Sequence, residues 1–198
     1  SSIRVAAGLV SEGAADALFS AGNTGATVVA AYTAFGMLKG ADRPALAATV
    51  PTMRGTAVLL DIGANADCRP PHLVAFAAMG TVFARVGLGI AAPEVGVLSI
   101  GQEAGKGNEL TREAHRLLRA TPLRFVGNVE ARDLYSGLAD VVVCDGFTGN
   151  VVIKVSEGVV GMVERMLGEA FAAMGGEGAR LAVDAVGHFR ARIDYAEY

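Results

Sequence analysis

Lysine, asparagine and aspartate residues that could bind an anion occur in short glycine-rich stretches of this chain. Lys106 lies between Gly105 and Gly107, where its amine and the neighbouring backbone N–H groups could hold an anion. The stretch is not a Walker A motif, because the required glycine spacing and the following Ser or Thr are absent. A solvated loop lysine is an equally good interpretation of Lys106 taken alone. Asn150 begins an apolar segment just after Gly149, at an expected helix start where free N–H groups would face a ligand.

Similar polar residues follow five segments that the pattern predicts to be strands. In chain order, the candidate ligand-binding residues are Asn23, Thr24, Asp61, Asn65, Lys106, Gly107, Asn108, Asn128, Asp145, Gly149 and Asn150. Any one of these stretches is more simply explained as a turn, because Gly, Asn and Asp are common turn residues. In open α/β sheets, however, ligands bind beyond the carboxyl ends of the strands. Five such stretches on one edge of a sheet therefore favour a single binding site.

Apolar periodicity predicts alternating strands and helices. Strands are expected over residues 17–20, 44–50, 57–60, 95–100, 123–126 and 141–144, and helices over 3–10, 26–38, 70–86, 110–118, 151–174 and 179–193. This alternation predicts an α/β protein: a three-layer α/β/α sandwich around a mostly parallel sheet. No repeat or linker divides the sequence, so we expect one domain over residues 1–198, with 159–193 forming a helical tip. Residues 151–174 are amphipathic, and dimer or core packing is favoured there over membrane contact, so the tip would serve for dimer or membrane contact.

Composition excludes several classes of function. The chain has 198 residues, a net charge of −3 and 6% aromatic residues, which argues against a nucleic-acid partner. No apolar run is long enough to span a bilayer. The two cysteines and three histidines show no metal-ligand spacing, and none forms a recognisable nucleophile–base pair, so neither metal nor covalent catalysis is expected. The run Gly87-Leu88-Gly89-Ile90-Ala91-Ala92 matches a dinucleotide fingerprint but follows a helix instead of a strand, so no such cofactor is predicted.

Several motifs together resemble one family, the bacterial PlsX phosphate acyltransferases. The matching segments are residues 20–26 (Ser-Ala-Gly-Asn-Thr-Gly-Ala), 59–68 (Leu-Leu-Asp-Ile-Gly-Ala-Asn-Ala-Asp-Cys), 106–109 (Lys-Gly-Asn-Glu), 127–130 (Gly-Asn-Val-Glu), 140–150 and 194–198. The resemblance implies a fold related to isocitrate dehydrogenase and phosphotransacetylase. Family members have further segments at both ends, so the chain is expected to be truncated at both.

The resemblance also implies a reaction and its partners. Acyl-ACP (acyl carrier protein) and inorganic phosphate would give acyl phosphate and free ACP, with no cofactor, in a cytosolic homodimer loosely associated with the membrane. A glycerol-3-phosphate acyltransferase would act downstream. Lys106 and Asn150 align with residues taken as essential in the family: Lys106 would hold phosphate and Asn150 would stabilise the oxyanion. The other candidates would shape the loops or orient the pantetheine arm.

Two alternatives stay open on sequence grounds. The first is a phosphotransacetylase-like enzyme that uses acyl-CoA. The second is a non-catalytic phosphate- or nucleotide-binding fragment. For carrier docking, Arg112, Arg116 and Arg119 on one helix face are candidates, although a solvated face explains them as well.

Overall fold

The computed structural model describes residues 1–174, 176 and 185–188. Its helices are α1 (Ser2–Ser11), α2 (Thr24–Phe35), α3 (Pro70–Gly87), α4 (Glu109–Leu118), the 3₁₀ helix η1 (Ala131–Ser136) and α5 (Gly146–Met174). Its strands are β1 (Ala47–Thr52), β2 (Gly55–Leu60), β3 (Glu94–Ser99), β4 (Arg124–Glu130) and β5 (Val141–Val143). These elements confirm the predicted α/β class.

The strands form one sheet in the order β1-β2-β5-β3-β4. β2, β5, β3 and β4 run parallel to one another, whereas β1 pairs with β2 as an antiparallel hairpin. The carboxyl ends of the four parallel strands therefore meet at one edge. β2 leads there into the Asp61 loop, β5 into α5 and β3 into the loop that contains Lys106.

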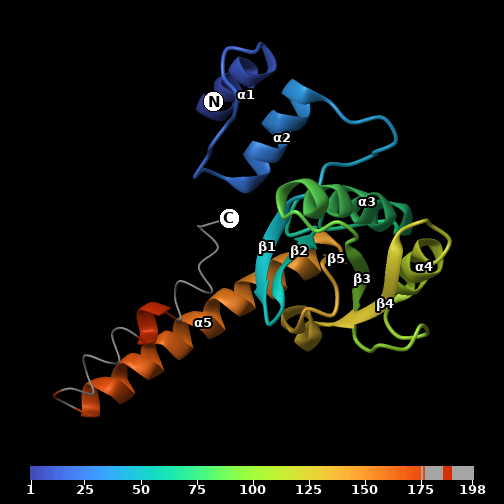
Figure 1. Cartoon of the computed structure of the whole chain (residues 1–198). Coiled ribbons are helices and arrows are strands. Elements are labelled where there is room, and N and C mark those ends of the chain that lie inside the picture. Colours follow the sequence, from blue (N-terminus) through green and yellow to red (C-terminus); the bar gives the residue numbers. More distant parts are fainter. Residues whose placement is uncertain (175, 177–184, 189–198) are drawn as a thin grey trace.

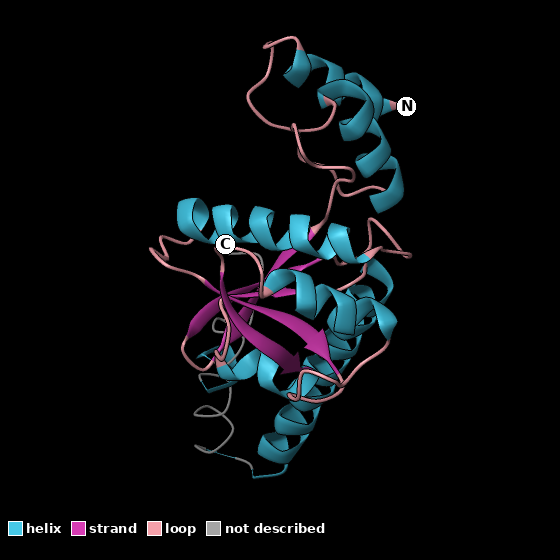
Figure 2. Cartoon of the chain, turned by 90° about the vertical axis from the view of Figure 1, so that its right-hand side faces the viewer, coloured by secondary structure: helices cyan, strands magenta, loops and turns pink. Residues whose placement is uncertain are grey.

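Helices cover both faces of the sheet, so the predicted three layers are present (Figures 1 and 2). Alternate strand residues point to opposite faces. Val58 and Leu60 pack under α3 and α4 with Phe76 and Leu118, whereas Leu59 packs in the second core, under η1 and the beginning of α5. The short apolar β5, which is fully buried, is the centre of both cores.

The first two helices correct one prediction. Residues 17–20 form no strand; they belong to the connection between α1 and α2. A strand needs a paired neighbour, and here the Ser20 hydroxyl instead accepts a hydrogen bond from Gly22 N at 3.2 Å as the chain turns toward α2. α1 and α2 pack on each other and lie outside the three layers, beyond α3 (Figure 1). Asn23 and Thr24 therefore follow a loop and not a strand.

The last described helix also differs from its prediction in length. α5 begins at Gly146, five residues before the expected 151, and continues unbroken to Met174. Its first turns cover the sheet, and the remainder extends away from it (Figure 1). Residues 185–188 are helical, while most of the helix expected over 179–193 lies outside the described residues. In the part of the chain that the structure describes, no helix is both long and apolar enough to cross a membrane.

Candidate functional site

The loop after β2 is organised around its own carboxylate. Asp61 is fully buried. Five N–H groups donate hydrogen bonds to it: the backbone groups of Leu46, Gly63, Ala64 and Asn65 and the Asn65 side chain, at 2.7–3.1 Å. Asn65 also donates to the Pro44 carbonyl oxygen at 2.7 Å. Asp61 and Asn65 therefore satisfy each other's polar groups and shape the loop.

The first turn of α5 packs directly against this loop. Asp145 caps the helix, since its carboxylate accepts hydrogen bonds from the backbone N–H and the hydroxyl of Thr148, both at 2.8 Å. Gly146 N donates to the Asn65 carbonyl oxygen at 2.8 Å. A Cβ on Gly149 would lie 1.9 Å from the Asp61 carbonyl oxygen, so only glycine fits there. Gly149 thus lets the helix start pack close to the loop.

Asn150 is exposed immediately above this contact. Its side chain lies about 4.0 Å from the point where a Gly63 Cβ would be, so it sits over the Asp61 loop. None of the hydrogen bonds among the described residues uses the Asn150 amide, which leaves both of its N–H donors available. A preorganised donor of this kind can stabilise a developing oxyanion.

The loop after β3 presents Lys106 on the neighbouring side of the site. β3 lies next to β5 in the sheet, so this loop is adjacent to the beginning of α5. The aliphatic part of Lys106 folds over Gly101, where a Cβ would meet the Lys106 Cγ at 2.9 Å. Lys106 is exposed and makes no ion pair with the described residues. Its ammonium group is therefore free to bind an anion.

Asn128 holds the Lys106 loop from below. It is a buried residue within β4, whereas the sequence placed it after a strand. Its Nδ2 donates to the carbonyl oxygens of Gly101 at 3.1 Å and Glu103 at 2.7 Å. The same Glu103 oxygen accepts the Lys106 backbone N–H at 2.9 Å. On the other side, Asn128 Oδ1 pairs with Nδ1 of the buried His115 at 2.8 Å.

Gly107 and Asn108 complete the loop and begin α4. Gly107 has φ of +102°, and a Cβ there would lie 2.0 Å from the Thr111 hydroxyl oxygen. Asn108 caps α4, accepting the Thr111 N–H at 2.9 Å. Beneath Gly107, the Ser99 hydroxyl oxygen is buried and has no hydrogen-bond partner among the described residues. Gly107 and Asn108 therefore fix the loop geometry, and Ser99 adds an unpaired polar group at its base.

The remaining candidates, Asn23 and Thr24, belong to the α1–α2 unit. Asn23 caps α2 by accepting the Ala26 N–H at 3.0 Å, and Thr24 is the first residue of that helix. No hydrogen bond between described residues joins either of them to the loops at the edge of the sheet. The structure thus places Asn23 and Thr24 at a helix start and does not bring them to the Asp61 and Lys106 loops.

Neither cysteine is suited to act as a nucleophile. Burial, followed by the carboxylates of Asp145 and Asp61, raises the pKa of Cys144 well above its ordinary value. Burial likewise raises the pKa of Cys68 to about 11. Because the thiolate is the reactive form, both thiols are poorly reactive near neutral pH. Among the described residues, His, Cys, Asp and Glu nowhere gather in the groups of three that a metal site needs.

Sequence reasoning missed Ser99 and His115. His115 carried a usable signal, since it neighbours Ala114 on the buried face of an otherwise strongly charged helix. A polar side chain on that face needs a buried partner, which here is Asn128. Ser99 gave no signal, because its isolation depends on how Gly107 and Thr111 pack over it.

Comparison with known proteins then places the chain in a family. A family model described as "Fatty acid synthesis protein" matches residues 1–198. The chain belongs to this fatty acid synthesis protein family. It is similar to the phosphate acyltransferases of Acidobacterium capsulatum and Geobacter sulfurreducens, each 50% identical over 200 residues. All of this chain is covered in both cases, against 59% and 58% of the relatives, so the chain spans less than two thirds of their length.

Solved structures confirm the fold expected for this family member. A phosphotransacetylase from Streptococcus pyogenes matches with a TM-score of 0.64 and 19% identity, covering 80% of this chain and 55% of that one. The EutD phosphotransacetylase from Staphylococcus aureus matches with a TM-score of 0.58 and 17% identity over 80% and 56% of the two chains. At these identities the likeness shows the fold alone, and it agrees with the predicted phosphotransacetylase-like sandwich.

Proposed function

We propose that this fatty acid synthesis family member carries the acyl-transfer site of a phosphate acyltransferase that converts acyl-ACP and inorganic phosphate to acyl phosphate and free ACP. One observation carries the proposal: two unpaired polar side chains lie at the carboxyl edge of the sheet, Lys106 on the loop after β3 and Asn150 in α5, which follows the neighbouring β5. The names of the similar relatives support phosphate as the acyl acceptor.

The proposed reaction needs no enzyme nucleophile. A phosphate oxygen, held beside Lys106, attacks the thioester carbonyl carbon, and the resulting oxyanion accepts hydrogen bonds from the Asn150 amide. Collapse of this intermediate breaks the C–S bond, forms acyl phosphate and releases the carrier thiolate, which then takes a proton. The raised thiol pKa values of Cys68 and Cys144 support direct attack by phosphate over a covalent route. Loss of one oxyanion donor typically costs about 3 kcal/mol of barrier.

The unpaired Ser99 hydroxyl is a further polar feature of the Lys106 loop. A buried polar group without a partner is rare and calls for a physical reason. Ser99 lies at the base of the loop that presents Lys106, where Gly107 and Thr111 cover it. Asp61, Asn65 and Asp145, whose carboxylate and amide groups are already satisfied, hold the loops in place.

The decisive experiment measures phosphate-dependent thiol release and acyl phosphate formation from palmitoyl-ACP. We expect Lys106→Ala and Asn150→Ala each to lower the rate by about 100-fold or more. Asp67→Ala is the matched control: Asp67 is exposed in the same connection between β2 and α3, and its loss should leave the rate unchanged. If the chain is inactive, the assay is repeated in a protein with the full length of the relatives. Inactivity there would overturn the proposal, whereas turnover of palmitoyl-CoA in place of palmitoyl-ACP would favour the acyl-CoA alternative.

We further propose that α5 contributes to a homodimer. Val151, Val155, Val159, Met162 and Met166 recur along one side of the helix and are 45–60% exposed. Burial of such a stripe against a second copy would remove apolar surface from water. Sedimentation velocity tests this: Val159→Glu with Met166→Glu should give monomers, while Arg165→Glu should leave the dimer intact. A wild-type monomer that pellets with anionic vesicles would instead favour the membrane contact also predicted for residues 159–193.

A cytosolic location and a downstream glycerol-3-phosphate acyltransferase partner stay predictions from the resemblance.

A further inference from the structure

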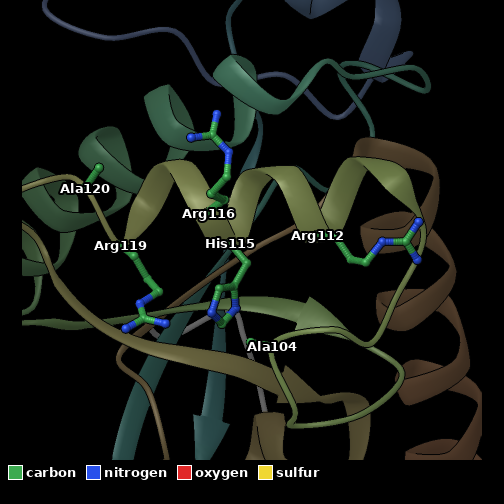
Figure 3. A pocket seen from close by; sticks show the side chains of 6 residues that line it. All are labelled: Ala104, Arg112, His115, Arg116, Arg119 and Ala120. Carbon is green, nitrogen blue, oxygen red and sulfur yellow. The ribbon is translucent and has the colours of Figure 1, made fainter.

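A pocket of about 420 Å³ lies beside α4. It is lined by Ala104, Arg112, His115, Arg116, Arg119 and Ala120. Figure 3 shows Arg112, His115 and Arg119 on the same side of α4, with Arg116 pointing away from them. The Arg112 and Arg119 guanidinium groups are turned toward opposite ends of the helix, and His115 lies between them. The volume lies in the range of about 300–1,000 Å³ found for small-molecule sites.

Two of the three arginines that line this pocket are not neutralised by described residues. Arg116 is paired with Glu113, and its Nη2 lies 2.6 Å from the Glu113 Oε1. Arg112, by contrast, donates to the neutral Gly107 carbonyl oxygen at 2.6 Å. Within the described residues neither Arg112 nor Arg119 makes an ion pair. Two guanidinium groups without carboxylate partners beside one cavity, in a chain whose net charge is −3, select for an anionic ligand.

The pocket shares a wall with the loop that presents Lys106. Ala104 lines the pocket two residues before Lys106. Arg112 bonds the carbonyl of Gly107, the residue after Lys106. His115 forms part of the lining and also bonds Asn128, which fixes the loop from below. A ligand in the pocket therefore contacts the same short segment that would hold phosphate.

We propose that Arg112 and Arg119 bind the phosphate ester at the base of the pantetheine arm that carries the acyl thioester. This inference rests on the proposed function, since it names the part of the acyl carrier that the site recognises. A phosphate ester presents oxygens that match the fixed fork of an arginine. The cavity is also larger than a single inorganic phosphate requires, which favours a phosphate attached to an organic arm. From the pocket, the arm follows the Lys106 loop to the edge of the sheet.

Direct binding tests the proposal without any need for turnover. Isothermal titration compares 4′-phosphopantetheine, pantetheine and inorganic phosphate as ligands of the whole chain. We expect 4′-phosphopantetheine to bind about tenfold or more tightly than pantetheine. Arg112→Ala and Arg119→Ala should each remove most of that difference, and Arg119→Lys should retain part of it because charge stays while the fork is lost.

Arg124→Ala is the matched control. Arg124 is exposed and paired with Glu94 at 2.8 Å, as Arg116 is with Glu113, but it does not line the pocket. It should change binding by less than about twofold. Equal binding of 4′-phosphopantetheine and pantetheine would overturn the proposal. A second result would also overturn it. If inorganic phosphate competes with the ester, and its binding is lost in Lys106→Ala but retained in Arg119→Ala, then the ester occupies the Lys106 site and not the pocket.

Kinetics separate failure of this inference from failure of the proposed function. In the active protein, Arg119→Ala should raise KM for acyl-4′-phosphopantetheine about tenfold and leave an acyl-N-acetylcysteamine thioester, which has no phosphate, unaffected. Turnover of both thioesters with no change in Arg119→Ala overturns the pocket assignment alone. If neither thioester is turned over but 4′-phosphopantetheine still binds more tightly than pantetheine, the proposed reaction is overturned and the pocket assignment is retained.

Discussion

Two loops meet at the same edge of the sheet, and they are built in opposite ways. In the Asp61 loop, the carboxylate is fully buried and accepts five hydrogen bonds. The Lys106 loop is largely exposed, and its main side-chain anchor is Asn128. The first loop uses its polar groups to hold the start of α5, while the second keeps a charged group unpaired. The contrast indicates that polar residues with similar sequence spacing serve as scaffold on one side of the site and as ligand-binding groups on the other.

The largest expected effect on stability is at Asp61. Asp61→Ala should lower the free energy of unfolding by at least about 3 kcal/mol, because several buried N–H groups would lose their acceptor. Urea denaturation measures this change, with Asp67→Ala as the exposed control. A loss as small as that of the control would show that the Asp61 loop is no more rigid than its neighbour.

Gly149 tests whether α5 must approach the Asp61 loop this closely. Gly149→Ala should cost about 1–3 kcal/mol, since the new methyl would overlap the Asp61 carbonyl oxygen. The control lies in the same helix: no atom is within 4 Å of a Cβ on Gly158, so Gly158→Ala should add about 0.5–1 kcal/mol. Thermal unfolding compares the two variants, and changes of the same sign would refute the close contact.

Asn128 tests how the Lys106 loop is held. Asn128→Ala should cost about 1–2 kcal/mol and should speed hydrogen exchange at the Lys106 amide, because the Glu103 carbonyl loses its anchor. Gln102→Ala is the control in the same loop, since it removes an exposed hydrogen bond to Asp133. Exchange accelerated equally by both variants would mean that Asn128 is not a specific anchor.

His72 provides a smaller, pH-dependent effect on the scaffold side. Burial, then the nearby positive charges of Arg69 and Arg43, lower the pKa of His72. The unfolded chain takes up a proton at the ordinary value of about 6.5, before the folded chain does. This contribution to stability is therefore complete above pH 6.5 and is lost as the pH falls toward the lowered pKa. Urea denaturation from pH 7.5 to 5 should show a shallower decline in His72→Asn, and parallel curves would contradict this.

The smallest expected effect on stability is at the two residues proposed to act on substrate. Lys106→Ala and Asn150→Ala should change the free energy of unfolding by no more than about 0.5 kcal/mol, because neither side chain has a partner to lose. Together with a large loss of activity, this would separate the binding groups from the scaffold. A substantial loss of stability in either variant would place that residue in the scaffold.

The sequence by itself determined the order of elements and the kinds of residue at each turn. The buried β-branched run of β5 could be recognised because it is short, apolar and flanked by polar residues. The same reasoning placed a strand at residues 17–20, which was wrong because these residues belong to the connection between α1 and α2. It also ended the strand predicted over residues 123–126 too early, since Gly127 and Asn128 are typical turn residues, although β4 continues to Glu130.

The tertiary structure decided which polar residues are satisfied and which stay free. Asp61 and Lys106 occur in similar glycine-rich stretches, yet one accepts five buried hydrogen bonds and the other makes no ion pair with the described residues. Four of the five hydrogen bonds to Asp61 come from Gly63, Ala64 and Asn65 nearby in sequence, and the fifth comes from Leu46. The loops themselves are held by distant residues, since Gly146 N donates to the Asn65 carbonyl oxygen and Asn128 donates to that of Gly101. The spacing of residues along a chain encodes local periodicity, whereas satisfaction of a polar group depends on long-range packing.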